Sequence, residues 1–352
     1  MNINGGGERI FRFDNIKAVL IVLVVFGHII SYNTIQEASE YRSVFMFIYS
    51  FHMPLFIFIS GFFHKNKNIK NKVIYFLVLG MLLRILVYIV NNLILGTTGS
   101  LSFISTDGCA WFLFAMAAYI GLAYLFRNYN PVLVLVLALI LGCFSGYDQD
   151  IGDLFVLSRI IVFFPFYWAG YCAGSKKWLS VFSDSSKHAV KAAEIMLSLA
   201  VLGIWIYFCF FHLEDVYELR PFFTGRHSYG EMYADSFSGL LIRLLCYAIT
   251  ALTGLAVIIL IPDRKLPAVT TLGERSLAVY FWHRPILFIF DYFGIFDSCF
   301  MADGSLLLCL ALAAALSAVL GQKVFHLPFE YLKNAILKNK KQDSESMNNA
   351  QE

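Results

Sequence analysis

Long apolar segments separated by short polar stretches make up most of this 352-residue chain. Several are close to the roughly 17 residues that a helix needs, as a minimum, to cross a bilayer's hydrocarbon core. Ten segments can be delimited: residues 14–32, 44–63, 73–95, 109–126, 131–145, 155–173, 190–211, 238–261, 275–295 and 304–326. The segments at 131–145 and 155–173 have the weakest pattern. The chain is predicted to be an all-α polytopic membrane protein with about ten transmembrane helices.

Composition agrees with this interpretation. Hydrophobic residues make up 59% of the chain and charged residues only 14%, whereas charged residues approach a quarter of a typical soluble domain. The formal charge of +3 is too small to suggest a nucleic-acid partner. The seven cysteines form no C-x-x-C pair and most lie inside apolar runs, so no disulfide or metal framework is indicated.

Charge alternates between successive connections of the chain. The stretch 64–72, "HKNKNIKNK", is basic, whereas the connection with Asp148, Asp150 and Asp153 is acidic. Lys and Arg accumulate on the cytoplasmic side of a membrane, which predicts that both termini are cytoplasmic. No small-x-small cleavage site follows the first apolar segment, so that segment is expected to be a helix rather than a cleaved signal peptide.

These patterns predict three regions. Residues 1–13 are expected to be a cytoplasmic segment and residues 14–332 a transmembrane domain. Residues 333–352 are polar and are expected to form a disordered cytoplasmic tail. The longest outer connection, 212–237, mixes charged and aromatic residues, so it is either an acceptor-binding segment or a plain extracellular loop.

The first apolar segment, "DNIKAVLIVLVVFGH", contains a histidine near its far end. Lys17 and His28 are eleven residues apart, about 16 Å along a helix, which is about half the hydrocarbon thickness. An ionisable group at that depth is costly and usually functional. His28 is therefore a candidate base or ligand, and the alternative is an incidental histidine in a signal-anchor helix.

Three more ionisable residues are predicted at a similar depth: His52, Arg84 and His283. Arg84 would lie about 18 Å beyond Lys72 along a helix. Each has a simpler explanation. Arg84 could pair with a carbonyl or a lipid phosphate, His52 could bond a neighbouring helix, and the sequence His-Arg-Pro from His283 could mark a kink.

The stretch "FHMPLFIFISGFF" at 51–63 places Pro54, Ser60 and Gly61 in one helix. Proline leaves carbonyls without their usual donor and glycine allows two backbones to approach. The stretch therefore predicts a distorted helix beside a channel, or helix packing through small residues.

Taken together, four stretches resemble the acyltransferase 3 family of integral membrane acyltransferases. They are "DNIKAVLIVLVVFGH", "FHMPLFIFISGF", "WFLFAM" at 111–116 and "SLAVYFWHRPI" at 276–286. The first has the family's basic-residue-x10-His spacing, and the first two helices are similar to the fucose-4-O-acetylase-like and polysaccharide O-acetyltransferase branch.

The resemblance implies an acyltransferase of a bacterial inner membrane that acts as an O-acetyltransferase. It would take an acyl group from cytoplasmic acetyl-CoA or another acyl-CoA and move it to a hydroxyl of a cell-envelope or exported glycan. The resemblance makes His28 catalytic and Lys17 its basic partner, with Asp14, His52 and His283 as supporting residues. The family's Arg-x-x-Arg pair is reduced here to Arg84.

Donor binding is assigned to that arginine together with Lys70 and Lys72, which could share the CoA phosphates. Either His28 acts as a general base, or it is itself acylated; the sequence does not separate these routes. A secondary transporter or glycan exporter would also place ionisable residues at the midplane and is the alternative function. A non-catalytic membrane sensor explains His28 and Arg84 less well.

Overall fold

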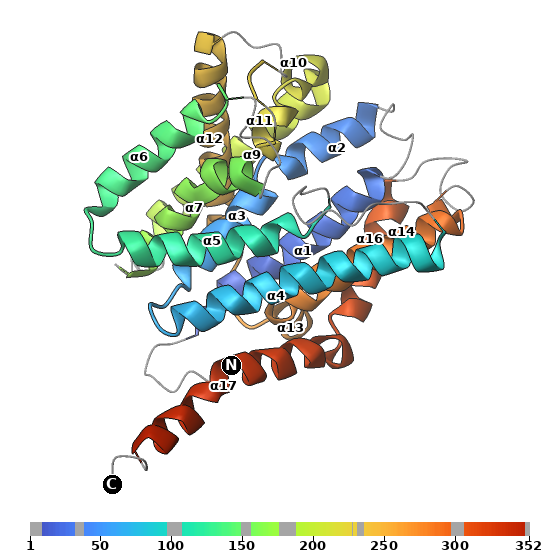
Figure 1. Cartoon of the computed structure of the whole chain (residues 1–352). Helices are drawn as coiled ribbons and strands as arrows, with labels where there is room; N and C mark the ends of the chain where they lie inside the picture. Colours follow the sequence, from blue (N-terminus) through green and yellow to red (C-terminus); the bar gives the residue numbers. More distant parts are fainter. Residues whose placement is uncertain are drawn as a thin grey trace.

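The computed structural model describes residues 9–31, 39–96, 108–148, 156–175, 188–226, 228–230, 236–296 and 306–348, and within these ranges every regular element is helical (Figure 1). The longer helices are α1 (Phe11–Ser31), α2 (Ser39–Tyr49), α3 (His52–Phe62), α4 (Ile69–Tyr88), α5 (Trp111–Phe126), α6 (Pro131–Phe144), α7 (Leu157–Ser175), α9 (His188–Phe211), α12 (Ser236–Leu260), α14 (Ser276–Tyr292), α16 (Leu306–Leu320) and α17 (Lys323–Asn348). A π-helical turn, η2 (Ile89–Ile94), extends α4, and three short helices complete the set: α10 (Leu213–Tyr217), α11 (Arg220–Thr224) and α13 (Pro267–Glu274).

Each of the ten apolar segments contains a helix, so the all-α prediction is confirmed. Five helical stretches are long and apolar enough to cross a membrane, and a sixth is obtained if α16 and α17, bent by 52°, form one span. The helices α5 and α6 are apolar but shorter. The count of about ten spans and the cytoplasmic location of both termini remain predictions.

The second apolar segment is broken between α2 and α3, at Ser50 and Phe51. Pro54 has no backbone N–H, so it cannot bond the carbonyl of Ser50 four residues earlier. Thr250 of α12 donates its hydroxyl to that carbonyl at 2.6 Å, and Trp205 of α9 bonds the Ser50 hydroxyl at 2.9 Å. The distortion expected from Pro54 is therefore present and is stabilised by neighbouring helices.

Glycines bring α3 and α7 together at backbone distance. A Cβ on Gly61 would come within 2.1 Å of the Tyr167 carbonyl oxygen, and one on Gly170 within 2.0 Å of the Phe58 carbonyl oxygen. Such approach is open only to glycine. Of the two interpretations of Gly61, helix packing is the one that the structure bears out.

The start of α1 is fixed against α13 by polar contacts and close packing. Asn15 donates to the carbonyls of Pro262 and Arg264 at 3.1 and 2.9 Å, and Thr270 donates to the Asn15 amide oxygen at 2.8 Å. Gly273 packs directly on the backbone of α1 at Asp14. These contacts set the position and rotation of α1, and with it the direction of His28.

Two ends of the helical bundle can be distinguished in Figure 1. The helices α13 and α17 lie at one end, and α10 and α11 lie at the opposite end. The helix α17 continues to Asn348, past residue 333, where disorder was expected to begin. Good helix formers such as Leu, Lys, Gln and Glu are frequent in this stretch, which favours continuation of the helix. Residues 1–8 and 349–352 of the predicted terminal regions lie outside the described residues.

Candidate functional site

Helices α1 and α14 place two histidines against each other. The rings of His28 and His283 are stacked, with centroids 5.2 Å apart and planes at 30°. Arg284, next in the chain, has Nη1 3.4 Å from His28 Nδ1. His283 is fully buried, whereas His28 and Arg284 are partly exposed. His28 therefore lies between helices α1 and α14 and is less completely buried than His283.

The hydrogen bonds of His283 fix its protonation pattern. Its Nδ1 lies 2.7 Å from the Tyr280 carbonyl oxygen and 3.1 Å from that of Val279, so Nδ1 donates. In the neutral ring Nε2 is then an acceptor. This atom is buried without a hydrogen-bond partner among the described residues. A buried acceptor without a donor is costly, so its presence beside His28 suggests that a substrate hydroxyl completes the site.

His52 reaches the same region from the break between α2 and α3. Its Nδ1 lies 2.8 Å from the Ile48 carbonyl oxygen, and its ring meets that of Tyr49 edge-on at 4.8 Å. The three predicted histidines converge, because His52 and His283 both lie within electrostatic reach of His28. His52 also satisfies a carbonyl at the break, so it has a structural contact as well.

A cavity of about 150 Å³ lies between α1, α3, α4, α5 and α14. Its eleven lining residues are Lys17, Ile21, Met53, Phe56, Ser60, Phe76, Phe112, Met116, Ser276, Leu277 and Tyr280. All except Phe76 belong to the four stretches singled out in the sequence. Lys17 and His28 lie on one face of α1, since eleven residues make about three turns. We call this space the Lys17 cavity.

Tyr280 separates the Lys17 cavity from the histidines. It lines the cavity, its ring centroid lies 5.8 Å from that of His283, and its hydroxyl donates to the Cys109 carbonyl. At the other end Lys17 pairs with Asp14 at 2.8 Å, and Asp14 also binds Arg9. Lys17 and Asp14 thus belong to the entrance of the cavity and lie about three turns of α1 away from His28.

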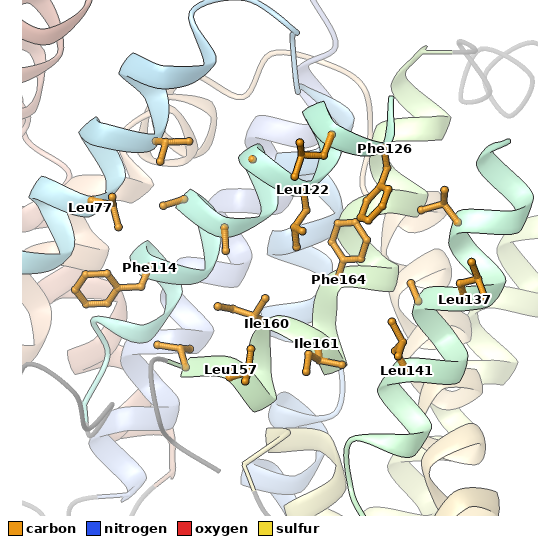
Figure 2. A pocket seen from close by; sticks show the side chains of 18 of the residues that line it. Leu77, Phe114, Leu122, Phe126, Leu137, Leu141, Leu157, Ile160, Ile161 and Phe164 are labelled. Atoms are coloured by element: carbon orange, nitrogen blue, oxygen red, sulfur yellow. The ribbon is translucent and has the colours of Figure 1, made fainter. Parts of the chain in front are cut away.

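Arg84 occupies a different place. It lines a groove of about 900 Å³ between α4, α5, α6 and α7, with its guanidinium carbon 5.0 Å from the centre of the Phe114 ring. The labelled side chains of this α4–α7 groove are all hydrocarbon (Figure 2). Among the described residues, the lining of the Lys17 cavity does not include Arg84, Lys70 or Lys72. The predicted donor-binding cations Arg84, Lys70 and Lys72 therefore do not line the same cavity as Lys17, and their contact with the donor remains a prediction.

Two residues near His28 were not predicted as functional. Arg284 was noted only as part of a kink, yet α14 continues through Pro285 and carries the guanidinium to His28. Tyr49 packs on Gly27, where an added Cβ would lie 3.0 Å from Tyr49 Cε2. An arginine in the middle of an apolar segment is the signal that could have identified Arg284.

Comparison with known proteins decides the class of this site. The acyltransferase 3 family model, described as "Acyltransferase domain", matches residues 10–321. The chain belongs to this family. Sixty residues of this acyltransferase are 40% identical to Nodulation protein NolL of Sinorhizobium fredii, and 60 are 42% identical to Nodulation protein NolL of Mesorhizobium japonicum. Each match covers 16% of this chain and 16% of the relative. No solved structure matches.

The acyltransferase site thus combines the groups that acyl transfer to an alcohol requires. It has the imidazole of His28, a guanidinium in contact with that imidazole, and a buried acceptor nitrogen on a second imidazole stacked on it. Among the described residues, no group of three or more His, Cys, Asp or Glu side chains is arranged to hold a metal ion. The chemistry available from these side chains is general acid-base, nucleophilic and electrostatic.

Proposed function

We propose that the protein is a membrane O-acyltransferase that moves an acyl group, in the simplest case acetyl, from acyl-CoA to a hydroxyl of a cell-envelope or exported glycan. One observation carries the proposal. Four stretches far apart in the sequence line one cavity that includes Lys17 and Tyr280, and the Tyr280 ring lies 5.8 Å from that of His283, which stacks on His28. Family membership supplies the acyltransferase class and disfavours the transporter alternative.

The donor enters at the α13–α17 end, which is the cytoplasmic end in the predicted orientation. Lys17 is the cation that lines this cavity, and it pairs with Asp14 at 2.8 Å. Cations at an entrance favour the phosphates of CoA, and the narrow, mostly apolar cavity suits the pantetheine arm and acyl group. Tyr280 then controls passage of the thioester to the histidines.

In the base route, the acceptor hydroxyl gives its proton to His28 as its oxygen attacks the thioester carbonyl. The contact of 3.4 Å between Arg284 and His28 Nδ1 is long and therefore weak. Arg284 can leave Nδ1 to stabilise the developing oxyanion, which frees the nitrogen to accept the proton. The tetrahedral intermediate then collapses, the C–S bond breaks, and the imidazolium returns its proton to the CoA thiolate.

In the acyl-histidine route, a His28 nitrogen attacks the thioester and CoA leaves as the thiolate. The acceptor hydroxyl then attacks the acyl-imidazole and reforms neutral His28. His283 Nε2, an acceptor without a partner among the described residues, is placed to take up the hydroxyl proton in this second step. It then releases that proton, which balances the CoA thiolate formed in the first step and restores neutral His283. The acyl group would then cross the membrane centre without CoA crossing.

The test is transfer of a radiolabelled acetyl group from acetyl-CoA to an acceptor by the purified protein. His28→Ala is expected to lower the transfer rate by about a hundredfold or more, because general base or nucleophilic catalysis is lost. Acetyl-CoA binding should persist. His28→Gln distinguishes hydrogen bonding from proton transfer, since an amide cannot take up a proton at neutral pH.

His326→Ala is the matched control, because His326 lies on α17 beside Glu330, away from the cavity. It should keep the wild-type rate. An acetyl label trapped on the protein without acceptor, mapped to His28, would select the acyl-histidine route. Wild-type transfer by a correctly inserted His28→Ala protein would contradict the proposed function.

A further inference from the structure

One face of α2 carries a row of charged and aromatic side chains. Arg42, Phe45, Tyr49 and, after the break, His52 follow each other at spacings of three and four residues, which places them along one side of the helix. Phe45 and Tyr49 are stacked, with ring centroids 3.7 Å apart. The row begins at the α10–α11 end and stops at the histidines.

The short helices α10 and α11 continue this row. Arg42 makes two bonds of 2.9 and 3.1 Å to the Glu214 carboxylate, and its guanidinium lies 4.3 Å from the Tyr217 ring centre. Arg220 lies between two rings, 5.6 Å from the centre of Tyr217 and 5.3 Å from that of Phe45. The result is a column of alternating guanidinium groups and rings, which we call the α2 column.

One of the two arginines of the α2 column has no acidic partner in the part of the chain that the structure describes. Arg42 is neutralised by Glu214, but Arg220 has no carboxylate within salt-bridge distance among the described residues. The Tyr49 hydroxyl lies within electrostatic reach of Arg284, Arg220 and Arg159, and no described carboxylate acts on it. Tyr49 also keeps accessible surface. Within the column, Arg220 is therefore the guanidinium whose charge a bound ligand could neutralise.

Arg220 is held ready to bind an anion. Stacking between two rings and a 3.0 Å bond to the Tyr217 hydroxyl fix the plane of its guanidinium. A guanidinium held in this way keeps further N–H donors, and a planar guanidinium binds a carboxylate or phosphate through two bonds. A neutral ligand would leave this charge without a partner.

We propose that the α2 column is the acceptor site and that the acceptor is a sugar bearing a negative charge, a carboxylate or a phosphate. This inference rests on the proposed function. Arg220 binds the anionic group at the α10–α11 end, and Tyr49 bonds a sugar hydroxyl and directs the reacting hydroxyl to His28. Donor and acceptor thus reach His28 from opposite ends of the protein.

The experiment uses two matched pairs of acceptors with the purified full chain and labelled acetyl-CoA. The first pair is p-nitrophenyl β-glucuronide and p-nitrophenyl β-glucoside. The second pair is the corresponding galacturonide and galactoside. In each pair the first sugar carries a carboxylate and the second is neutral. Each is measured as an acceptor and as an inhibitor of transfer. For the wild type, at least one uronide should have a KM as acceptor, or an inhibition constant, about tenfold lower than that of its neutral partner. This is the difference expected for a charge-assisted contact.

The diagnostic variant is Arg220→Gln, which should reduce that preference to within about twofold while leaving the KM for acetyl-CoA unchanged. Arg127→Gln is the control, because Arg127 also stacks on a tyrosine, Tyr124, and lies outside the α2 column. It should retain the preference.

Three results would overturn the inference. They are equal use of charged and neutral sugars, uronides that neither accept nor inhibit, and an Arg220→Gln effect confined to the KM for acetyl-CoA, which would assign Arg220 to the CoA phosphates. Failure of the proposed function has a different signature: acetyl-CoA cleavage would not depend on His28 in any of these assays.

Discussion

Two cavities formed by described residues differ in what lines them, and the larger one has fewer polar groups. The α4–α7 groove holds about 900 Å³ and the Lys17 cavity about 150 Å³. The groove is lined by hydrocarbon apart from Arg84, whereas the smaller cavity has Lys17, Ser60, Ser276 and Tyr280 along it. A transfer reaction needs polar groups that converge on one point, and only the smaller cavity leads to such a point.

Arg84 and Arg284 differ in the same way. The guanidinium of Arg84 is placed over the Phe114 ring, so part of its cost in an apolar environment is offset by a cation–π contact. The guanidinium of Arg284 lies against the imidazole of His28 and also 4.8 Å from the Phe288 ring centre. The two arginines thus differ in their neighbours: Arg84 contacts an aromatic ring in an apolar groove, whereas Arg284 contacts the candidate catalytic histidine.

The largest effect that separates the two arginines is expected at Arg284. Arg284→Gln should lower kcat by about 10²–10³-fold, the loss typical of removing one oxyanion donor. The KM for acyl-CoA should change little, because Arg284 does not line the Lys17 cavity. Steady-state kinetics with labelled acetyl-CoA measure both constants.

Arg284→Lys serves as the conservative variant and should recover part of the rate, since it keeps the charge and loses the planar donor geometry. Exposed Arg264→Gln is the surface control. If Arg284→Gln raised KM alone, Arg284 would be a binding residue, and the oxyanion role would fall.

A smaller effect, on the KM for acyl-CoA, is expected to show which of the two cavities binds the donor. Ser60→Trp places a large ring in the Lys17 cavity and should raise the KM for acyl-CoA by about tenfold, because the donor loses its path. Gly121→Trp is the matched control in the α4–α7 groove, where a Cβ on Gly121 would meet no atom within 4 Å. It should keep the wild-type KM.

Thermal unfolding in detergent checks that both variants fold. If Gly121→Trp blocked transfer and Ser60→Trp did not, the donor would bind in the larger groove and the assignment of the two cavities would be reversed.

The sequence predicted the parts of the site that depend on position along one helix. The Lys17–His28 spacing placed both residues on one face of α1, and Pro54 predicted the break that Thr250 stabilises. These predictions succeeded because helical periodicity and the missing proline N–H are local properties.

The sequence did not predict which helices are neighbours. Depth along a helix gives a height in the membrane but no rotation about the helix axis, so Arg84 and His28 were placed at one level without being placed together. Arg284 was missed for the converse reason: its contact with His28 depends on how α14 packs on α1. The α2 column also needs α10 and α11, which lie more than 160 residues away in the chain.

The smallest effect is expected at Arg84. Arg84→Gln should leave kcat and the KM for acyl-CoA within about twofold of the wild type, because the guanidinium lies over Phe114 in the α4–α7 groove and does not line the Lys17 cavity. Kinetics measured beside Arg284→Gln in the same preparation give the comparison directly. The sequence had predicted a donor contact for Arg84, together with Lys70 and Lys72. A large rise in the KM for acyl-CoA in Arg84→Gln would restore that prediction, because the donor would then have to reach the groove, and it would show that depth in the membrane was a better guide to function than the direction of the side chain.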